Sequence, residues 1–154
     1  MDPKIWAERL RRTLNRQSVL LVLRELGLTG DDIATATDAD IRTVRRWLEG
    51  QEPAKQHDEA VDRLRTAVLY LLQRRAMPVE DISLWLRSRS LELGPDPVLG
   101  VRRPLDALRS GGLADVLAAA DAFIVPASPH PIKAIPPETY AADLRQSASD
   151  PVAV

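Results

Sequence analysis

Apolar side chains recur every three or four residues through most of the first 124 positions of this 154-residue chain. That period is typical of helices with one buried face, and the alternating pattern that strands show persists nowhere in the sequence. The spacing predicts helices over residues 5–26, 31–37, 40–49, 58–75, 105–109 and 113–124, and one more that begins at Pro78. We therefore expect an all-α fold.

Glycines and prolines indicate where the predicted helices end. Gly27 and Gly50 stand just past the ends of two helices, where glycine is the usual residue. Residues 94–97, Gly-Pro-Asp-Pro, interrupt the helical pattern, and prolines become frequent from residue 126 onward. These breaks divide the chain into residues 1–52, 53–77, 78–125 and 126–154. We expect the last segment to be a flexible, proline-rich tail.

Residues 30–48 have the pattern of a helix-turn-helix, in which two short helices are joined by a turn of about three residues. Four apolar residues have the spacing needed to meet inside the corner between the helices: Ile33, Ala39, Val44 and Trp47. Ala34 supplies the small side chain that the closest approach of the helices requires. Asp38 stands at the turn, where aspartate tolerates a left-handed backbone, and Asp40 stands where a residue that caps the second helix is expected.

The outer face of the second helix carries the residues that we expect to contact DNA: Asp40, Ile41, Arg42, Thr43, Arg45 and Arg46. A helix exposed in this way fits the major groove, where an arginine can donate two hydrogen bonds to a guanine edge. Four aspartates place negative charge beside this face: Asp31, Asp32, Asp38 and Asp40. A helical hairpin with a solvated charged face, or an adaptor that contacts only proteins, is therefore an alternative.

The formal net charge of −1 excludes a strongly basic protein that coats nucleic acid non-specifically. Contact with DNA must then depend on a local cluster, either Arg9, Arg11, Arg12 and Arg16 or Arg42, Arg45 and Arg46. The chain contains no cysteine, which excludes disulfides and is typical of a reducing compartment. The sequence shows neither a signal peptide nor an apolar run that could span a bilayer. We expect a cytoplasmic protein with no membrane contact.

The C-terminal half carries an ordered series of short motifs. They are the tryptophan-bearing helix end Ile82-Ser83-Leu84-Trp85-Leu86, the loop 94–108, the pair Gly111-Gly112 and the closing pair Val116-Leu117. In this order, behind a helix-turn-helix, the series resembles the toxin-binding domain of the Xre/MbcA/ParS antitoxins over about residues 78–124. The step Arg103-Pro104-Leu105 is the specific part of the resemblance. The proline-rich tail has no counterpart in it.

The resemblance implies the antitoxin of a type II toxin–antitoxin system. Such antitoxins neutralise a toxin of the RES class, which consumes NAD, by covering its active site, and they repress their own operon. Residues 1–52 would then be the DNA-binding region, 53–77 a connecting amphipathic helix and 78–125 the toxin-binding domain. The expected partners are a cognate toxin, operator DNA and a second copy of the chain, in a homodimer or a higher hetero-oligomer with the toxin.

Six residues are the candidates for toxin binding: Trp85, Leu99, Val101, Arg102, Arg103 and Leu105. Prolines at positions 95, 97 and 104 stiffen this loop and lower the entropic cost of presenting it to a partner. Arginine is enriched among the residues that anchor interfaces, because its planar group binds carboxylates. In the alternative interpretation the loop only connects two helices, with its apolar side chains in the core.

The sequence does not predict an enzyme. His57 and His130 are the only histidines, and neither stands at a spacing from other ligands that suits a metal site. No nucleophile with an adjacent base and no phosphate-binding loop can be identified, so we expect no cofactor. The alternative to an antitoxin is a stand-alone helix-turn-helix transcriptional regulator, whose C-terminal half would dimerise or sense a ligand.

Overall fold

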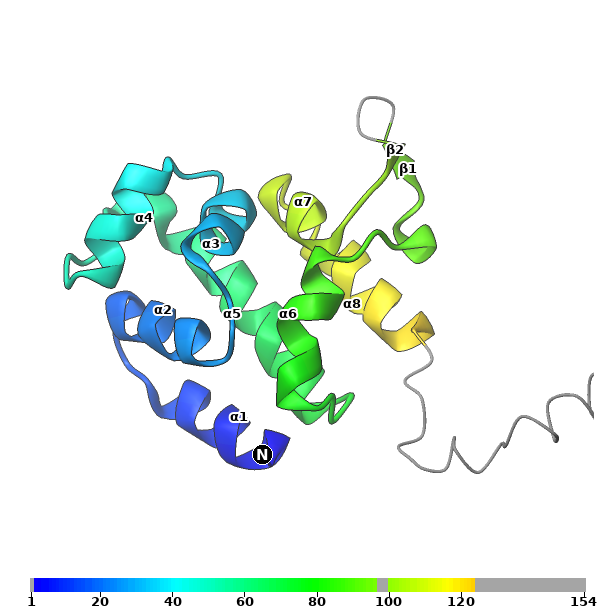
Figure 1. The fold of residues 1–154 in the computed structure, drawn as a ribbon, viewed down its shortest axis with the longest axis horizontal. Coiled ribbons are helices and arrows are strands. Elements are labelled where there is room, and N and C mark those ends of the chain that lie inside the picture. The colour runs from blue at the N-terminus through cyan, green and yellow to red at the C-terminus, as the bar shows by residue number, and fades with distance from the viewer. Residues whose placement is uncertain (1, 97–99, 124–154) are drawn as a thin grey trace, which may run out of the picture. The chain divides into compact units, whose positions relative to one another are not determined.

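The computed structural model of the chain describes residues 2–96 and 100–123 (Figure 1). Its α-helices are α1 Pro3–Arg12, α2 Arg16–Glu25, α3 Gly30–Thr37, α4 Ile41–Leu48, α5 Asp58–Gln73, α6 Val79–Arg87, α7 Pro104–Arg109 and α8 Leu113–Ala122. Two single turns of 3-10 helix are η1 Lys55–His57 and η2 Leu91–Leu93, and the strands are β1 Pro95–Asp96 and β2 Gly100–Val101. The strands form one antiparallel pair, with Pro95 opposite Val101. The predicted all-α fold is confirmed.

The prediction of one continuous helix over residues 5–26 was wrong. The chain turns between α1 and α2, and Leu14, an apolar residue at the turn, is 93% exposed. The side chain of Asn15 accepts a hydrogen bond from the Ser18 amide at 2.8 Å and so caps the start of α2. The guanidinium of Arg65, from α5, donates at 2.9–3.0 Å to three carbonyl oxygens at the end of α1: those of Leu10, Arg11 and Thr13. Backbone polar groups at both helix ends created by the break therefore have hydrogen-bond partners.

The glycines mark helix ends as predicted. Gly27 (φ +111°) follows α2, and the amide of Leu28 closes that end by donating to the carbonyl of Leu23 at 3.1 Å. Gly111 (φ +81°) follows α7, and the amide of Gly112 donates to the carbonyl of Ala107 at 2.8 Å. A Cβ atom at position 112 would lie 3.0 Å from that same carbonyl oxygen, so this close approach also favours glycine.

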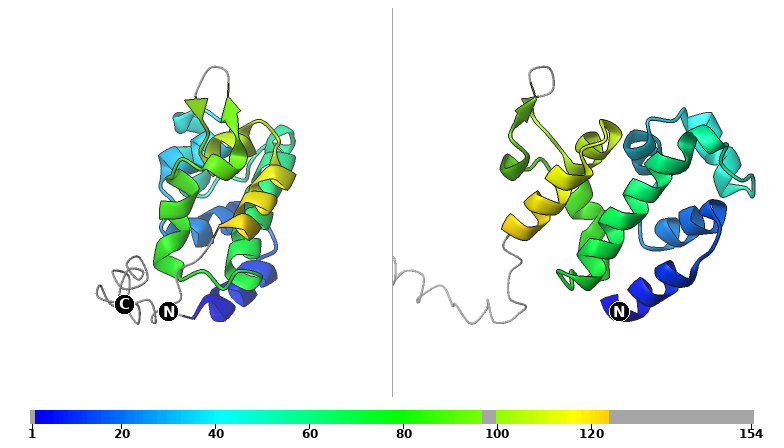
Figure 2. Two further views of the ribbon diagram at one scale, coloured as in Figure 1. Left: turned by 90° about the vertical axis from the view of Figure 1, so that its right-hand side faces the viewer. Right: turned by 180° about the vertical axis from the view of Figure 1, so that it is seen from behind.

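Helix α5 lies between α1–α3 on one side and α7 and α8 on the other (Figure 2). Its inner face has the predicted helical spacing and is buried along its whole length: Ala60, Val61, Leu64, Ala67, Val68, Leu71 and Leu72. One cluster of buried hydrophobic residues extends from Ala7 in α1 to Ala120 in α8. The predicted boundaries after residues 52 and 77 fall in the segments before η1 and α6. Residues on both sides of each boundary belong to this one hydrophobic cluster.

No helix of the described residues is long and apolar enough to cross a membrane. Over residues 2–96 and 100–123, no group of three or more His, Cys, Asp or Glu side chains is placed to hold a metal ion. The proline-rich tail predicted at residues 126–154 and the candidate Leu99 lie outside the described part of the chain.

Candidate functional site

Helices α3 and α4 form a tight pair joined by residues 38–40 (Figure 1). Asp38 has the left-handed backbone predicted for the turn, with φ 55° and ψ 40°. The carboxylate of Asp40 accepts a hydrogen bond from the Arg42 amide at 3.4 Å, so this residue caps α4 as predicted. Thr29 and Asp32 form a reciprocal capping box at the start of α3. Each end of the short connection is thus fixed by a local polar contact.

The corner between α3 and α4 is filled by the apolar residues that the spacing selected. Ile33, Val44 and Trp47 are buried to 1% exposure or less, and Ala39 packs against them. The rings of Trp47 and His57 pack edge to face with their centroids 4.9 Å apart. The Trp47 carbonyl accepts a hydrogen bond from the Gln17 side chain of α2 at 2.9 Å. Helix α4 is therefore held from α2, α3 and η1, which leaves its opposite face to solvent.

That opposite face carries three arginines. Arg42, Arg45 and Arg46 are exposed, and the structure shows no ion pair for any of them within residues 2–96 and 100–123. Arg46 donates a long hydrogen bond of 3.4 Å to the hydroxyl of Thr43, one turn earlier in the helix. Ile41 is half-buried beside Gly30, so of the six DNA-contact candidates it is turned toward α3. The exposed part of α4 thus presents cationic groups that can meet phosphates or base edges.

Two of the four aspartates near this face are neutralised by arginines from the C-terminal half. Arg87 of α6 binds Asp32 at 2.7 Å, where the Asp32 side chain is 9% exposed. Burial raises the pKa of Asp32, but hydrogen bonds from Arg87 and Thr29 outweigh it, so the pKa lies below its ordinary value. Arg109 of α7 binds Asp38 at 2.9 Å. The acidic character that the sequence suggested for this surface is therefore reduced.

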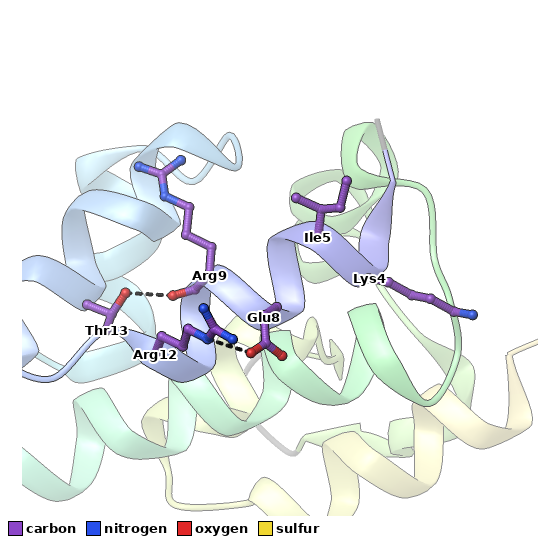
Figure 3. A pocket seen from close by; sticks show the side chains of 6 residues that line it. All are labelled: Lys4, Ile5, Glu8, Arg9, Arg12 and Thr13. Carbon is purple, nitrogen blue, oxygen red and sulfur yellow. Dashed lines mark hydrogen bonds and ion pairs between the residues drawn. The ribbon is translucent and has the colours of Figure 1, made fainter.

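The arginines of the other cluster, in α1 and α2, are paired with carboxylates of the fold. Arg9 contacts Glu25 at 2.7 Å and stacks over the Trp6 ring, and Arg16 contacts Asp62 at 2.8 Å. Arg11 and Arg12 both bind Glu8, which is on the same helix. In Figure 3, Arg12 and Glu8 line a shallow hollow along α1 together with the exposed Ile5. Each cation of this cluster already has an anionic partner.

Among the candidates for toxin binding, Trp85 and Leu105 lie in the hydrophobic core, at 5% and 1% exposure. The Trp85 ring packs against Phe123 with their centroids 6.0 Å apart. Val101 is half-buried in β2, and its carbonyl accepts a hydrogen bond from Arg89 at 2.7 Å. Trp85 and Leu105 thus contribute to the core, and Val101 is fixed through its backbone.

Arg102 and Arg103 are engaged with their own neighbourhood. Arg102 donates to the Leu93 carbonyl at 2.7 Å and stands 3.9 Å from Asp115. Arg103 binds Asp106 through two parallel hydrogen bonds of 2.9 Å, which close the first turn of α7. Those bonds lower the pKa of Asp106 below its ordinary value despite partial burial. Arg102 therefore ties the end of β2 to η2, and Arg103 fixes the start of α7.

Sequence reasoning missed two exposed apolar residues in this half. Leu84 is 60% exposed on α6, and Leu91 is 81% exposed on η2. Leu91 borders a small hollow lined by Trp85, Ser88, Arg89, Ser90, Leu91, Glu92 and Phe123. Leu84 could have been found, because the buried stripe of α6 is Ile82, Trp85 and Leu86, which leaves Leu84 on the opposite face. No pattern in the sequence marks Leu91 as exposed.

The chain is 30% identical over 102 residues to the mycobacterial cidal antitoxin MbcA of Mycobacterium tuberculosis, which covers 66% of this chain and 83% of that protein. The MbcA of Mycobacterium bovis matches to the same extent. The chain is also 27% identical over 115 residues to the probable mycobacterial cidal antitoxin Rv3188 of M. tuberculosis, across 75% of this chain and 92% of that protein. No protein-family model and no solved structure matches the chain.

Proposed function

The chain belongs to the family of the mycobacterial cidal antitoxin MbcA, and from this premise we propose that it is the antitoxin of a type II toxin–antitoxin system. Its partner is a cognate protein toxin, and the resemblance of residues 78–124 to the toxin-binding domain favours a toxin of the RES class. The antitoxin acts in the cytoplasm by covering the active site of that toxin, and it performs no catalysis itself. The match to MbcA over most of the length of that protein carries this proposal.

The surface proposed for the toxin is the outer side of the C-terminal half. Leu84 and Leu91 supply exposed apolar side chains there, which a protein partner could bury. The sequence candidates Arg102 and Arg103 stay candidates together with Leu99, and the Leu93 carbonyl and the Asp106 carboxylate hold the two arginine side chains in place. Side chains that are already held in place lose less entropy when they bind.

We also propose that the antitoxin represses its own operon through α4. Arg42, Arg45 and Arg46 supply the cations for phosphate or base contacts, and Asp40 and Thr43 lie on the same helix. Since one such helix reads a short half-site, operator binding requires two copies of the chain, in a homodimer or in a larger complex with the toxin. A monomeric mass in light scattering at micromolar concentration would contradict the dimer.

Co-expression tests the proposal. The tagged chain is expressed with the product of the neighbouring gene, and the expected result is a stable complex together with relief of growth arrest. Leu91→Asp should weaken the complex, whereas Leu14→Asp, which alters an equally exposed leucine of the other half, should not. If the neighbouring product is harmless and does not co-purify, the chain is instead a stand-alone transcriptional regulator.

A further inference from the structure

Helix α3 is held at both ends by arginines that come from the C-terminal half. Near its start, Arg87 of α6 donates to the two Asp32 oxygens at 2.9 and 2.7 Å and to the Gly27 carbonyl at 3.1 Å. At its end, Arg109 of α7 donates to Asp38 at 2.9 Å. Between these two contacts α3 packs along α7. The helix pair α3–α4 is thus attached to α6 and α7 at two defined points, both on α3.

The two attachments differ in their surroundings. The Asp32 carboxylate is almost fully covered and also serves the capping box with Thr29, so it bonds to both the helix start and the Arg87 guanidinium. The pair of Asp38 and Arg109 is more than half exposed on both sides. The first contact is therefore the stronger, and the second can be altered without placing an unpaired charge in the interior.

We propose that Arg87 and Arg109 are positioning residues for α4, so that the C-terminal half sets the orientation of the helix proposed to read DNA. This inference rests on the proposed operator binding. Helix α4 follows Asp38 by only three residues and shares the Ile33, Val44 and Trp47 core with α3. A shift of α3 against α6 or α7 therefore moves α4 as well.

The proposal gives the two proposed interfaces a physical connection. Arg87 lies one turn beyond Leu84 on α6, and Arg109 ends α7, the helix that Arg103 caps. A protein that binds Leu84 and residues 100–103 before α7 contacts the same two helices that hold α3. Coupling between two binding sites is reciprocal. The factor by which that protein changes the affinity for operator DNA is therefore also the factor by which operator DNA changes the affinity for that protein.

Amide hydrogen exchange of the full chain tests the attachment directly. Arg87→Gln should raise exchange in α3 and α4 about tenfold, and Arg109→Gln about threefold, while exchange in α1 stays unchanged. Arg109→Gln keeps the test valid if Arg87→Gln does not fold. Arg12→Gln, which removes the same charge from an exposed pair on α1, is the matched control. Unchanged exchange in α3 and α4 of Arg109→Gln and of folded Arg87→Gln would overturn the proposal.

An operator titration then tests the consequence for DNA. Arg87→Gln should bind operator about tenfold and Arg109→Gln about threefold more weakly than the natural chain, with unchanged helical content, and Arg12→Gln should bind normally. Natural affinity in both variants would show that the attachment does not position α4, and so would refute the inference alone. If the natural chain itself does not bind operator, the proposed DNA function fails, and the exchange result still decides whether Arg87 and Arg109 hold α3 and α4.

Discussion

The start of the chain and helix α4 each carry a dense cluster of arginines, but the two clusters differ in their partners. In α1 and α2 every arginine of the cluster contacts a carboxylate: Arg9 with Glu25, Arg11 and Arg12 with Glu8, and Arg16 with Asp58 and Asp62. In α4, Arg42, Arg45 and Arg46 point to solvent, and none forms an ion pair with a described residue. Two clusters that look equally basic in the sequence therefore have different charges available to a partner.

This difference separates arginines that stabilise the fold from arginines that can bind. A guanidinium already paired with a carboxylate adds little net charge to its surface, and it must lose that partner before it can bind a phosphate. An unpaired guanidinium displaces the counterions of DNA at no such cost, which makes the binding dependent on salt. The comparison therefore favours α4 over the cluster in α1 and α2 as the surface for the proposed DNA contact.

The largest expected effect comes from removing the α4 cluster. Replacing Arg42, Arg45 and Arg46 together by Gln should weaken operator binding by about 3 kcal/mol or more, since each arginine contact is worth about 1–3 kcal/mol. The slope of log affinity against log salt concentration should become shallower by about 0.9 for each lost phosphate contact. Glutamine keeps the helix propensity close to that of arginine. Titrations of labelled operator at several salt concentrations measure both quantities.

The matched control replaces Arg9, Arg11 and Arg12 by Gln, which changes the net charge by the same amount. Operator affinity and its salt dependence should stay at their natural values, measured at a temperature where the variant is folded. An equal loss of affinity in both triple variants would mean that only the net charge matters, and it would remove the distinction between the clusters.

The face of α4 was predictable from the sequence because it depends on local spacing. The positions of Val44 and Trp47 in a helix of fixed period determine that Arg42 and Arg46 face outward. The partners of the first cluster were not predictable, because Arg16 finds Asp62 at a distance of 46 residues in the sequence. The break before Asn15 has the same origin, since Arg65 stabilises it from α5. Contacts over such separations leave no periodic pattern.

The next effect concerns Arg65, which bonds to the end of α1 without a carboxylate. Arg65→Met keeps the apolar stem but removes the guanidinium bonds to three carbonyl oxygens, of which, within the described residues, only that of Leu10 keeps a second donor, the Thr13 amide. It should lower the free energy of unfolding by about 2–3 kcal/mol. Arg74→Met, just beyond the end of the same helix, should change it far less. Urea unfolding followed by circular dichroism gives both values. Equal stabilities would show that water replaces the guanidinium at no cost.

A smaller effect, dependent on pH, is expected at Asp32. Its pKa lies below the ordinary value of 3.8, so its pairing with Arg87 stabilises the fold at neutral pH. That contribution is complete above the ordinary pKa and is lost as the pH falls through the lowered pKa. Asp32→Asn should therefore cost about 1–2 kcal/mol at pH 7, and the difference from the natural chain should shrink below about pH 4. A difference that stays constant from pH 7 to pH 3 in urea unfolding would contradict this.

The C-terminal candidates show where spacing is ambiguous. Trp85 and Leu105 were selected because the motif resembles a binding domain, yet an apolar residue at helical spacing fits the core as well as an interface. Arg103 was selected as a cation on a stiff loop, but the sequence does not show that Asp106, one helical turn later, binds it. Burial decides between these roles, and burial depends on which helices pack together.

The smallest effect separates the two clusters most cleanly, because it compares one residue from each. Arg12 is 80% exposed, and its partner Glu8 keeps Arg11 when Arg12 is removed. Arg12→Gln should therefore leave both the urea midpoint and operator affinity unchanged, since an exposed pair within one helix contributes little. Arg46→Gln, which removes the same charge from α4, should also leave the midpoint unchanged but weaken operator binding. A loss of operator affinity in Arg12→Gln alone would place α1, and not α4, against the DNA.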